Sequence, residues 1–197
     1  MVLCEIKGLD KHFGGIHVTR DMSFRIMQGE LSAIIGPNGA GKTTLFNLIS
    51  GFIRPDKGSI FFKGIDITKA SPEDITRLGM VRSFQVSNIF YDEKVIDNIF
   101  LASLSYHKRN WCFYKTSNVH KDAMNDAESI INSLNLNEKA HLWAYELSHG
   151  DQKVLDIAIA LAMNPSLLLM DEPTSGMSPD ERIRMKALLK RLHEEFK

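Results

Sequence analysis

The sequence predicts an α/β protein in which a glycine-rich loop joins a strand to a helix. The loop consists of Gly36, Pro37, Asn38, Gly39, Ala40, Gly41, Lys42, Thr43 and Thr44. The apolar run 31–35 before the loop predicts a buried strand, and the run 45–49 after it predicts a helix. A second continuous apolar run, 167–170, predicts a fully buried parallel strand. These three observations together are typical of the α/β class.

The loop has the composition of a phosphate-binding loop. Its glycines allow the backbone to curl with N–H groups facing inward, and the helix that follows contributes its positive end. Lys42 supplies a full charge near the terminal phosphates, and the Thr43 hydroxyl can bind Mg²⁺. The sequence therefore predicts binding of a nucleoside triphosphate. A chance match in an ordinary loop is the alternative, which the flanking strand and helix disfavour.

Composition excludes several classes of function. The 197 residues contain 24 Lys and Arg against 24 Asp and Glu, so we expect no nucleic-acid partner. Cys4 and Cys112 are far apart in the sequence, which fits a reducing compartment. The N-terminus lacks the features of a signal peptide, and no apolar run approaches the ~20 residues of a membrane span. We expect a soluble protein that only a partner would bring to a membrane.

The N-terminal part predicts a small, partly antiparallel sheet from runs at 3–6, 24–26 and 60–64. Phe13, beside two glycines, could stack on a nucleotide base or simply pack in the core. Ser71 and Pro72 predict the start of a short helix that ends near residue 78. The run 81–85 predicts a strand that ends in Gln85.

Helical periodicity dominates the middle of the chain. Apolar spacing predicts helices at 95–105, 121–134 and 151–163, with a loop at 106–119. We therefore divide the chain into three parts. They are a nucleotide-binding core with the phosphate loop (1–85), an inserted helical subdomain (86–162) and a second part of the core (163–197).

Two further motifs carry polar chemistry. Asp171 and Glu172 follow the apolar run 167–170, where carboxylates face the ligand crevice of an open α/β sheet. Asp171 can hold Mg²⁺ and Glu172 can polarise an attacking water, although the pair alone could simply begin a loop. Ser148 directly precedes a predicted helix. It can serve as the N-cap of that helix, with Asp151 at the third helical position, or it can form an anion site with Gly150, and both roles can hold together.

The order of the motifs along the chain resembles that of the nucleotide-binding subunits of ABC transporters. The motifs are the phosphate loop, Gln85, Leu-Ser-x-Gly at 147–150, the Asp-Glu strand and the segment 175–179. The segments 11–15, 44–51, 77–85 and 148–152 are most similar to ATPases of branched-chain amino acid importers. Urea importers and lipopolysaccharide exporters share much of this pattern and remain alternatives. The resemblance covers essentially the whole chain. It implies a P-loop NTPase core of the RecA-like type, with an N-terminal antiparallel β portion and an inserted α-helical subdomain.

The resemblance also implies a role for each site residue, with ATP and Mg²⁺ as cofactors. The magnesium ligands would be Thr43, Gln85 and Asp171. The catalytic residues would be Lys42, Gln85 and Glu172. The nucleotide contacts would be Phe13 on adenine, the loop residues 36–44 on the phosphates, and Ser148 and Gly150 on the γ-phosphate held by a second subunit.

The implied partners are a second ATP-binding subunit, transmembrane permease subunits and, indirectly, a solute-binding protein. Two ATP-binding subunits would close head to tail around two ATP molecules, and hydrolysis would release them, powering import of a small solute. A groove near 85–91 would take a helix of the permease. The protein would lie on the cytoplasmic face of the cell membrane, held there by the permease subunits.

The sequence departs from the family pattern in three places. His149 and Asp151 replace the commoner Gly and Gln, and Ser178 stands at or near the usual Asp. The family also has a γ-phosphate-contacting histidine on the strand after the last helix. The chain stops at Lys197, before that strand, so we expect a truncated ATPase domain that binds nucleotide better than it hydrolyses it. The alternatives are a non-hydrolysing ATP-binding fragment or regulatory module and, disfavoured by the neutral charge, a soluble ABC ATPase of DNA repair or translation.

Overall fold

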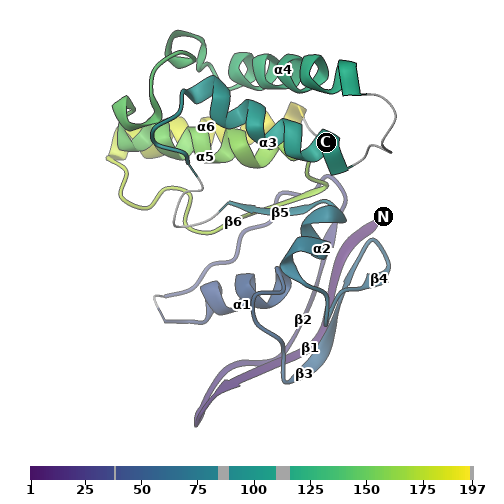
Figure 1. Cartoon of the computed structure of the whole chain (residues 1–197). Helices are drawn as coiled ribbons and strands as arrows, with labels where there is room; N and C mark the ends of the chain where they lie inside the picture. Colours follow the sequence, from purple (N-terminus) through teal and green to yellow (C-terminus); the bar gives the residue numbers. More distant parts are fainter. Residues whose placement is uncertain (38, 84–88, 110–115, 196–197) are drawn as a thin grey trace. The chain divides into compact units, whose positions relative to one another are not determined.

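A computed structural model describes residues 1–37, 39–83, 89–109 and 116–195 of the chain (Figure 1). The chain divides into two compact units. The first comprises residues 1–78 together with 190–197, and the second comprises residues 79–189. Within the residues described, no helix is both long and apolar enough to cross a bilayer.

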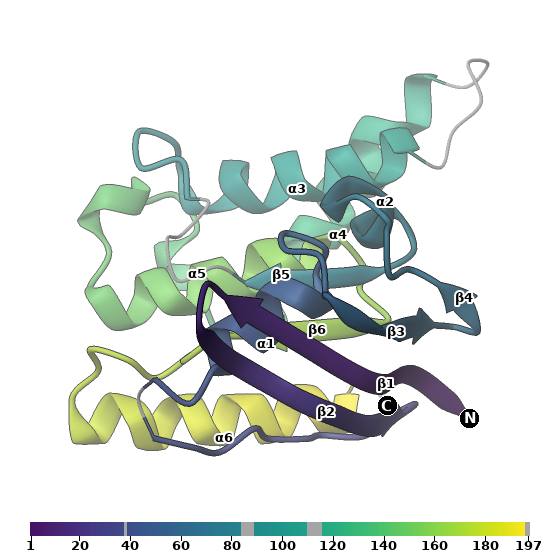
Figure 2. The ribbon, with the colours of Figure 1, turned by 90° about the horizontal axis from the view of Figure 1, so that it is seen from below.

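The first unit contains an antiparallel sheet with the strand order β2-β1-β3-β4. Its strands are β1 (Val2–Phe13), β2 (Ile16–Met27), β3 (Lys57–Phe62) and β4 (Ile65–Asp66). Figure 2 shows β1 and β2 side by side as a long hairpin, paired from Val2↔Met27 to Phe13↔Ile16. The predicted antiparallel sheet is therefore confirmed, with strands longer than the sequence indicated.

The core face of β1 changes phase at a bulge. Cys4 and Ile6 are buried, as alternation along a strand requires, but the next buried side chain is Leu9. The register of β1 shifts between Ile6 and Leu9, where Gly8 adopts a φ of +57°. The bulge keeps Leu9 on the core side. Burial also raises the pKa of the Cys4 thiol to about 12, so this cysteine acts as an apolar core residue.

Two helices belong to the first unit, α1 (Lys42–Ile49) and α2 (Pro72–Arg77). Both were predicted from the sequence. The N-cap of α2 is Ser71, whose Oγ accepts a hydrogen bond from the Asp74 backbone N–H at 3.2 Å. Helix α1 buries Leu45, Leu48 and Ile49.

The apolar run before the phosphate loop is not a strand, so the prediction of a buried strand at 31–35 is wrong. These residues carry no strand assignment, and Leu31, Ile34 and Ile35 are 54%, 41% and 93% exposed. An apolar run becomes a strand only when a neighbouring strand completes its hydrogen-bond ladder. None of the described strands pairs with this segment.

The second unit holds a parallel pair, β5 (Met80–Ser83) and β6 (Leu167–Met170), in the register Met80↔Leu167 to Ser83↔Met170. The predicted parallel strand at 167–170 is thus confirmed. Its predicted full burial is wrong, since only Leu169 is buried. A strand with one described ladder neighbour keeps its other edge uncovered, which limits the burial of its side chains.

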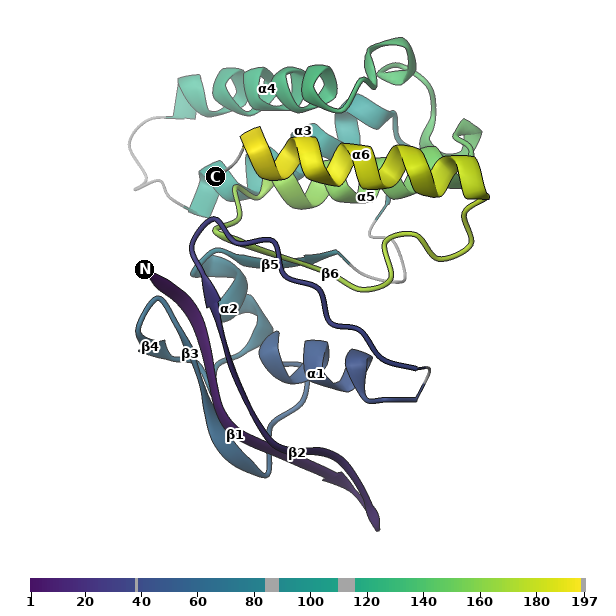
Figure 3. The same cartoon turned by 180° about the vertical axis from the view of Figure 1, so that it is seen from behind.

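Helices make up most of the second unit. They are α3 (Val95–Arg109), α4 (Thr116–Ser133), α5 (His149–Ala162) and α6 (Pro179–Glu195), with short 3-10 turns at Asn137–Lys139 and Ala144–Glu146. Helix α6 continues into the residues grouped with the first unit. Figure 3 shows α3, α4 and α5 gathered together, and the three helices contact one another.

The predicted loop at 106–119 is wrong at both ends, because α3 continues to Arg109 and α4 begins at Thr116. Polar tertiary contacts extend α3 where apolar periodicity gives no signal. The Tyr106 hydroxyl accepts a hydrogen bond from Asn164 Nδ2 at 2.8 Å, and His107 Nε2 lies 2.7 Å from Asp126 Oδ2 on α4. Residues 110–115 of the predicted loop lie outside the described residues.

A buried asparagine fixes the chain that enters α3. Asn98 is 2% exposed, and its Oδ1 accepts a hydrogen bond from the Phe90 backbone N–H at 2.8 Å. Its Nδ2 donates to the carbonyls of Phe90 and Lys94, each at 3.0 Å. A buried side chain that replaces missing backbone partners in this way holds the 90–94 turn against the helix.

We expect Asn98→Ala to lower the free energy of unfolding by about 2 kcal/mol, because it removes the acceptor of the Phe90 N–H and a donor to the carbonyls of Phe90 and Lys94. Urea unfolding followed by circular dichroism measures the change. Asn132→Ala, at an exposed position of α4, is the control and should stay within about 0.5 kcal/mol of the unaltered protein. Equal stability of the two variants would contradict a supporting role for Asn98.

Candidate functional site

The phosphate loop ends in a glycine that the fold requires. Gly41 is the N-cap of α1, with a φ of +85°, and its carbonyl accepts a hydrogen bond from the Leu45 N–H at 2.9 Å. A Cβ on Gly41 would lie 2.8 Å from Val18 Cγ1 on β2. The loop therefore packs directly against the β1–β2 hairpin, and this contact excludes any side chain at position 41. Asn38 lies outside the described residues.

The charge of Lys42 is held within the loop. Its Nζ donates hydrogen bonds to the carbonyls of Gly36 at 2.8 Å and Pro37 at 2.9 Å. Thr43 is exposed in the first turn of α1. A lysine and a hydroxyl are thus positioned by the same loop and helix start, as the sequence predicted for these two residues.

Phe13 lies at the turn end of the hairpin whose second strand contacts Gly41. Its side chain is 46% exposed, so it is not a core residue, and its use in base stacking stays a prediction. Lys11 Nζ lies 5.6 Å from the centroid of the Phe13 ring and 2.8 Å from Asp56 Oδ1. The Lys11 ammonium therefore lies between the exposed Phe13 ring and the Asp56 carboxylate.

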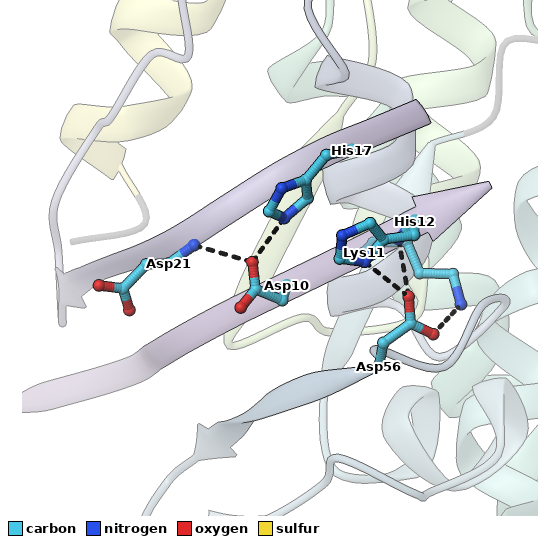
Figure 4. A network of polar contacts seen from close by, with 6 residues as sticks. All are labelled: Asp10, Lys11, His12, His17, Asp21 and Asp56. Atoms are coloured by element: carbon cyan, nitrogen blue, oxygen red, sulfur yellow. Dashed lines mark hydrogen bonds and ion pairs between the residues drawn. The ribbon is translucent and has the colours of Figure 1, made fainter. Parts of the chain in front are cut away.

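Carboxylates fix the side chains at this end of the hairpin (Figure 4). The rings of His12 and His17 stack with centroids 3.9 Å apart, and His17 Nε2 lies 2.7 Å from Asp10 Oδ1. The hydrogen bond to His17, helped by the Asp21 N–H, lowers the pKa of Asp10. Hydrogen bonds from Lys11 and from the His12 N–H likewise lower the pKa of Asp56.

The motif at 147–150 forms the start of α5 as predicted. Ser148 is the N-cap, and its Oγ accepts a hydrogen bond from the Asp151 N–H at 3.2 Å. The Asp151 carboxylate accepts from Lys139 Nζ and from Ser148 Oγ, each at 2.6 Å. Burial alone would raise the pKa of Asp151, but these two bonds outweigh it and the pKa is lowered. Lys139 thus neutralises an acidic residue where an anion would bind.

The start of α5 lies against the segment that follows β6. A Cβ on Gly176 would come within 3.0 Å of His149 Cε1, and a Cβ on Gly150 would meet Glu181 Oε1 at 2.5 Å. Glu181 also accepts a hydrogen bond from the Ser178 N–H at 2.8 Å, and Ser178 Oγ accepts from the Glu181 N–H at 3.4 Å, so the two residues cap the start of α6. His149, which replaces the family's usual Gly, therefore contacts the 175–178 segment within the same unit.

The two carboxylates after β6 have different surroundings. Asp171 is buried, and its Oδ2 lies 3.1 Å from Arg82 Nη2 on β5. Glu172 is exposed and adopts a φ of +48°. A left-handed conformation costs a non-glycine residue about 1 kcal/mol, and such residues are concentrated at functional sites.

Each unit thus assembles part of the predicted site. The first brings together the phosphate loop, Lys42, Thr43 and the hairpin that carries Phe13. The second contains Ser148 and Gly150 at the start of α5, and Asp171 and Glu172 after β6. Lys139 and Arg82 were not predicted as site residues from the sequence. The only signal for Arg82 was a charged residue within a strand, between Val81 and Ser83. Gln85 lies outside the described residues. Within the described ranges, no group of three His, Cys, Asp or Glu side chains is arranged to hold a metal ion.

The chain is similar to known proteins over most of its length. The sequence profile of the ABC transporter family matches residues 19–175. A probable branched-chain amino acid transport ATP-binding protein, LivG, of Archaeoglobus fulgidus is 36% identical over 91% of this chain and 70% of its own. The high-affinity branched-chain amino acid transport ATP-binding protein BraF of Pseudomonas aeruginosa is 33% identical over 98% and 78%.

Solved structures give the same result. The crystal structure of the ADP conformation of an ATP-binding cassette of an ABC transporter superposes with a TM-score of 0.83 at 29% identity, covering 99% of this chain and 78% of the other. A dimeric cassette bound to ADP and phosphate, at 24% identity and a TM-score of 0.79, shares the fold. The predicted fold class, a P-loop NTPase core with an antiparallel β portion and helical segments, is confirmed.

We expect Gly41→Ala to destabilise the protein by about 1–3 kcal/mol more than Gly39→Ala does. Both glycines have positive φ values, +85° and +81°, so the backbone strain is similar. Only position 41 adds a collision with Val18, because a Cβ at Gly39 meets nothing within 4 Å. Urea unfolding of both variants, and of Gly41→Ala combined with Val18→Ala, measures the difference. Equal costs at the two positions would contradict the close packing of the loop on β2.

The Lys139–Asp151 pair should make stability depend on pH in the acid range. A carboxyl with a lowered folded pKa stabilises the protein above its unfolded pKa of about 4, and this contribution is lost as the pH falls through the folded value. Lys139→Met should therefore lower the melting temperature at pH 7, and the difference should shrink below about pH 4. Lys121→Met, at an exposed position of α4, should show no such trend. A difference that is independent of pH would count against the pair.

Proposed function

Because the chain belongs to the ABC transporter family, we propose that it is the ATPase subunit that powers import of branched-chain amino acids. Its curated relatives at 36% and 33% identity are branched-chain amino acid transport ATP-binding proteins. Family membership makes the chain an ATP-binding subunit and an ATPase. The direction of transport and the class of solute belong to the proposal.

Lys42 carries the proposal. The Lys42 ammonium contacts the carbonyls of Gly36 and Pro37, and it can exchange them for the oxygens of a triphosphate, which bear full negative charge. The exchange favours the bound state because phosphate oxygens carry full negative charge, whereas the carbonyl oxygens carry only a partial charge. Gly36, Asn38, Gly39, Ala40, Gly41 and Thr44 would supply backbone N–H groups around the phosphates. Pro37, which has no N–H, would hold the shape of the loop, and Phe13 would stack on adenine.

Thr43, Gln85 and Asp171 would hold Mg²⁺. The donor set fits, because hydroxyl, amide and carboxylate oxygens are the hard ligands that Mg²⁺ takes beside phosphate oxygens. Bound Mg²⁺ would neutralise charge that develops on the transferred phosphoryl group. Glu172, exposed at the end of β6, would accept a proton from the attacking water, and Gln85 would orient that water.

A second ATP-binding subunit completes the proposed site. Ser148 and Gly150 would donate to the γ-phosphate held by the other subunit, and ATP would close the pair head to tail. The neutralisation of Asp151 by Lys139 supports this role, since an unpaired carboxylate there would repel the phosphate. The division into a core at 1–85 and 163–197 and a helical subdomain at 86–162 is part of this proposal.

Transmembrane permease subunits would hold the protein at the inner face of the membrane, with a solute-binding protein as an indirect partner. Four exposed aromatic side chains support a docking surface near 85–91. Phe90 and Tyr91 are 60% and 43% exposed, and the stacked rings of Trp143 and Tyr145 lie 6.2 Å apart. Aromatic side chains on a surface are typical of protein interfaces.

We expect Lys42→Ala to weaken binding of magnesium-ATP at least tenfold, measured with a fluorescent ATP analogue, because one charge-assisted contact is lost. The control is Lys63→Ala, since Lys63 Nζ also donates to a backbone carbonyl, that of Leu78, at 2.8 Å. The control should bind as the unaltered protein does. Failure of the unaltered protein to bind ATP, or equal behaviour of the two variants, would overturn the proposed function.

Glu172→Gln should keep ATP binding and reduce steady-state hydrolysis by about a hundredfold or more, because the amide cannot accept the proton of the water. Glu194→Gln, at an exposed position of α6, is the control. The assay uses the protein with its permease partners in vesicles, with labelled leucine and labelled urea as alternative solutes. ATP-dependent uptake of urea and not of leucine would show that the transported solute is urea instead of an amino acid. ATP-dependent export would contradict the proposed direction of transport.

A further inference from the structure

We propose that Arg82 is the resident counter-ion of Asp171, and that it competes with Mg²⁺ for this carboxylate. Arg82 would then set how strongly Mg²⁺ promotes ATP binding. This inference rests on the proposed function, because it takes Asp171 as a magnesium ligand. Arg82 itself would touch neither ATP nor the metal, and acts through Asp171 as a positioning residue.

The geometry brings the two charges together inside the second unit. Strands β5 and β6 are parallel, with Arg82 opposite Leu169 and Ser83 opposite Met170. Asp171 follows the last paired residue of β6, and its Oδ2 lies 3.1 Å from Arg82 Nη2. The side chains are 7% and 3% exposed. The register of two short strands therefore places a guanidinium on a buried carboxylate.

Burial makes this contact a strong one. A carboxylate out of water requires a partner, and removing one member of a buried ion pair is far more costly than breaking an exposed pair. Arg77 and Asp74 provide the contrast within the same chain. They lie 3.3 Å apart with side chains 65% and 58% exposed, where water screens both charges.

The same contact opposes a metal ion at Asp171. The carboxylate oxygen that accepts from Arg82 is occupied, and a guanidinium repels a divalent cation brought to the same group. Arginine does not deprotonate in proteins, so the repulsion can be relieved only if the side chain moves. Mg²⁺ at Asp171 therefore competes with Arg82 for the charge of one carboxylate.

The test measures the factor by which Mg²⁺ tightens binding of an ATP analogue that carries an N-methylanthraniloyl fluorophore. Each variant is titrated in EDTA and in saturating Mg²⁺, and the ratio of the two dissociation constants is compared. We expect Arg82→Met to raise this ratio about tenfold, because the competitor of the metal is gone. The control, Arg77→Met, should leave the ratio unchanged. A ratio taken within one variant cancels any general loss of nucleotide affinity.

Thermal unfolding without nucleotide or metal tests the ion pair independently. Arg82→Met should lower the melting temperature by several degrees, and Asp171→Asn added to it should restore much of the loss, because a buried amide needs no counter-charge. Arg82→Lys keeps a charge and should raise the magnesium ratio less than Arg82→Met. This variant decides the matter if the methionine variant does not fold.

The outcomes separate the two proposals. If the unaltered protein binds the analogue neither in EDTA nor in Mg²⁺, the proposed function fails and the Arg82 inference fails with it. If the analogue binds normally but the ratio falls or stays constant in the folded Arg82 variants, only the Arg82 inference is overturned. A raised ratio with a lowered melting temperature supports it.

Discussion

A charge taken out of water must keep a partner, and this constraint organises the polar parts of the structure. The ammonium of Lys42 rests on the carbonyls of Gly36 and Pro37. Lys139 contacts Asp151 at the start of α5, and Arg82 contacts Asp171 after β6. In each case, the group would contact a phosphate or a metal, or lie beside one. Its charge already has a polar or oppositely charged partner within the same unit. Ligand binding then exchanges partners instead of creating new charges in the interior.

This exchange explains why the departures from the family pattern are tolerable. Asp151 brings a negative charge to a helix start that should attract an anion, yet Lys139 lies 2.6 Å away. His149 brings a ring where the family has no side chain, and the ring lies against Gly176, where a Cβ would come within 3.0 Å. Both residues therefore have contacts within the second unit.

Local signals explain how much of the candidate site was predictable. The N-caps Ser71 and Ser148 act on residues within four positions, and both helix starts were found from the sequence. The roles of Phe13, Asp171 and Glu172 were suggested by their positions and implied by family resemblance, and that of Gln85 by resemblance alone; all four remain predictions.

The sequence by itself determined the loop chemistry, the helix starts and the α/β class, because spacing of a few residues encodes them. Only the tertiary structure decided that 31–35 is not a strand, that β6 is half-buried and that α3 extends to Arg109, since ladder partners and polar contacts come from distant segments. Arg82 and Asp171 are 89 residues apart. No local pattern joins them; the parallel register of β5 and β6 does.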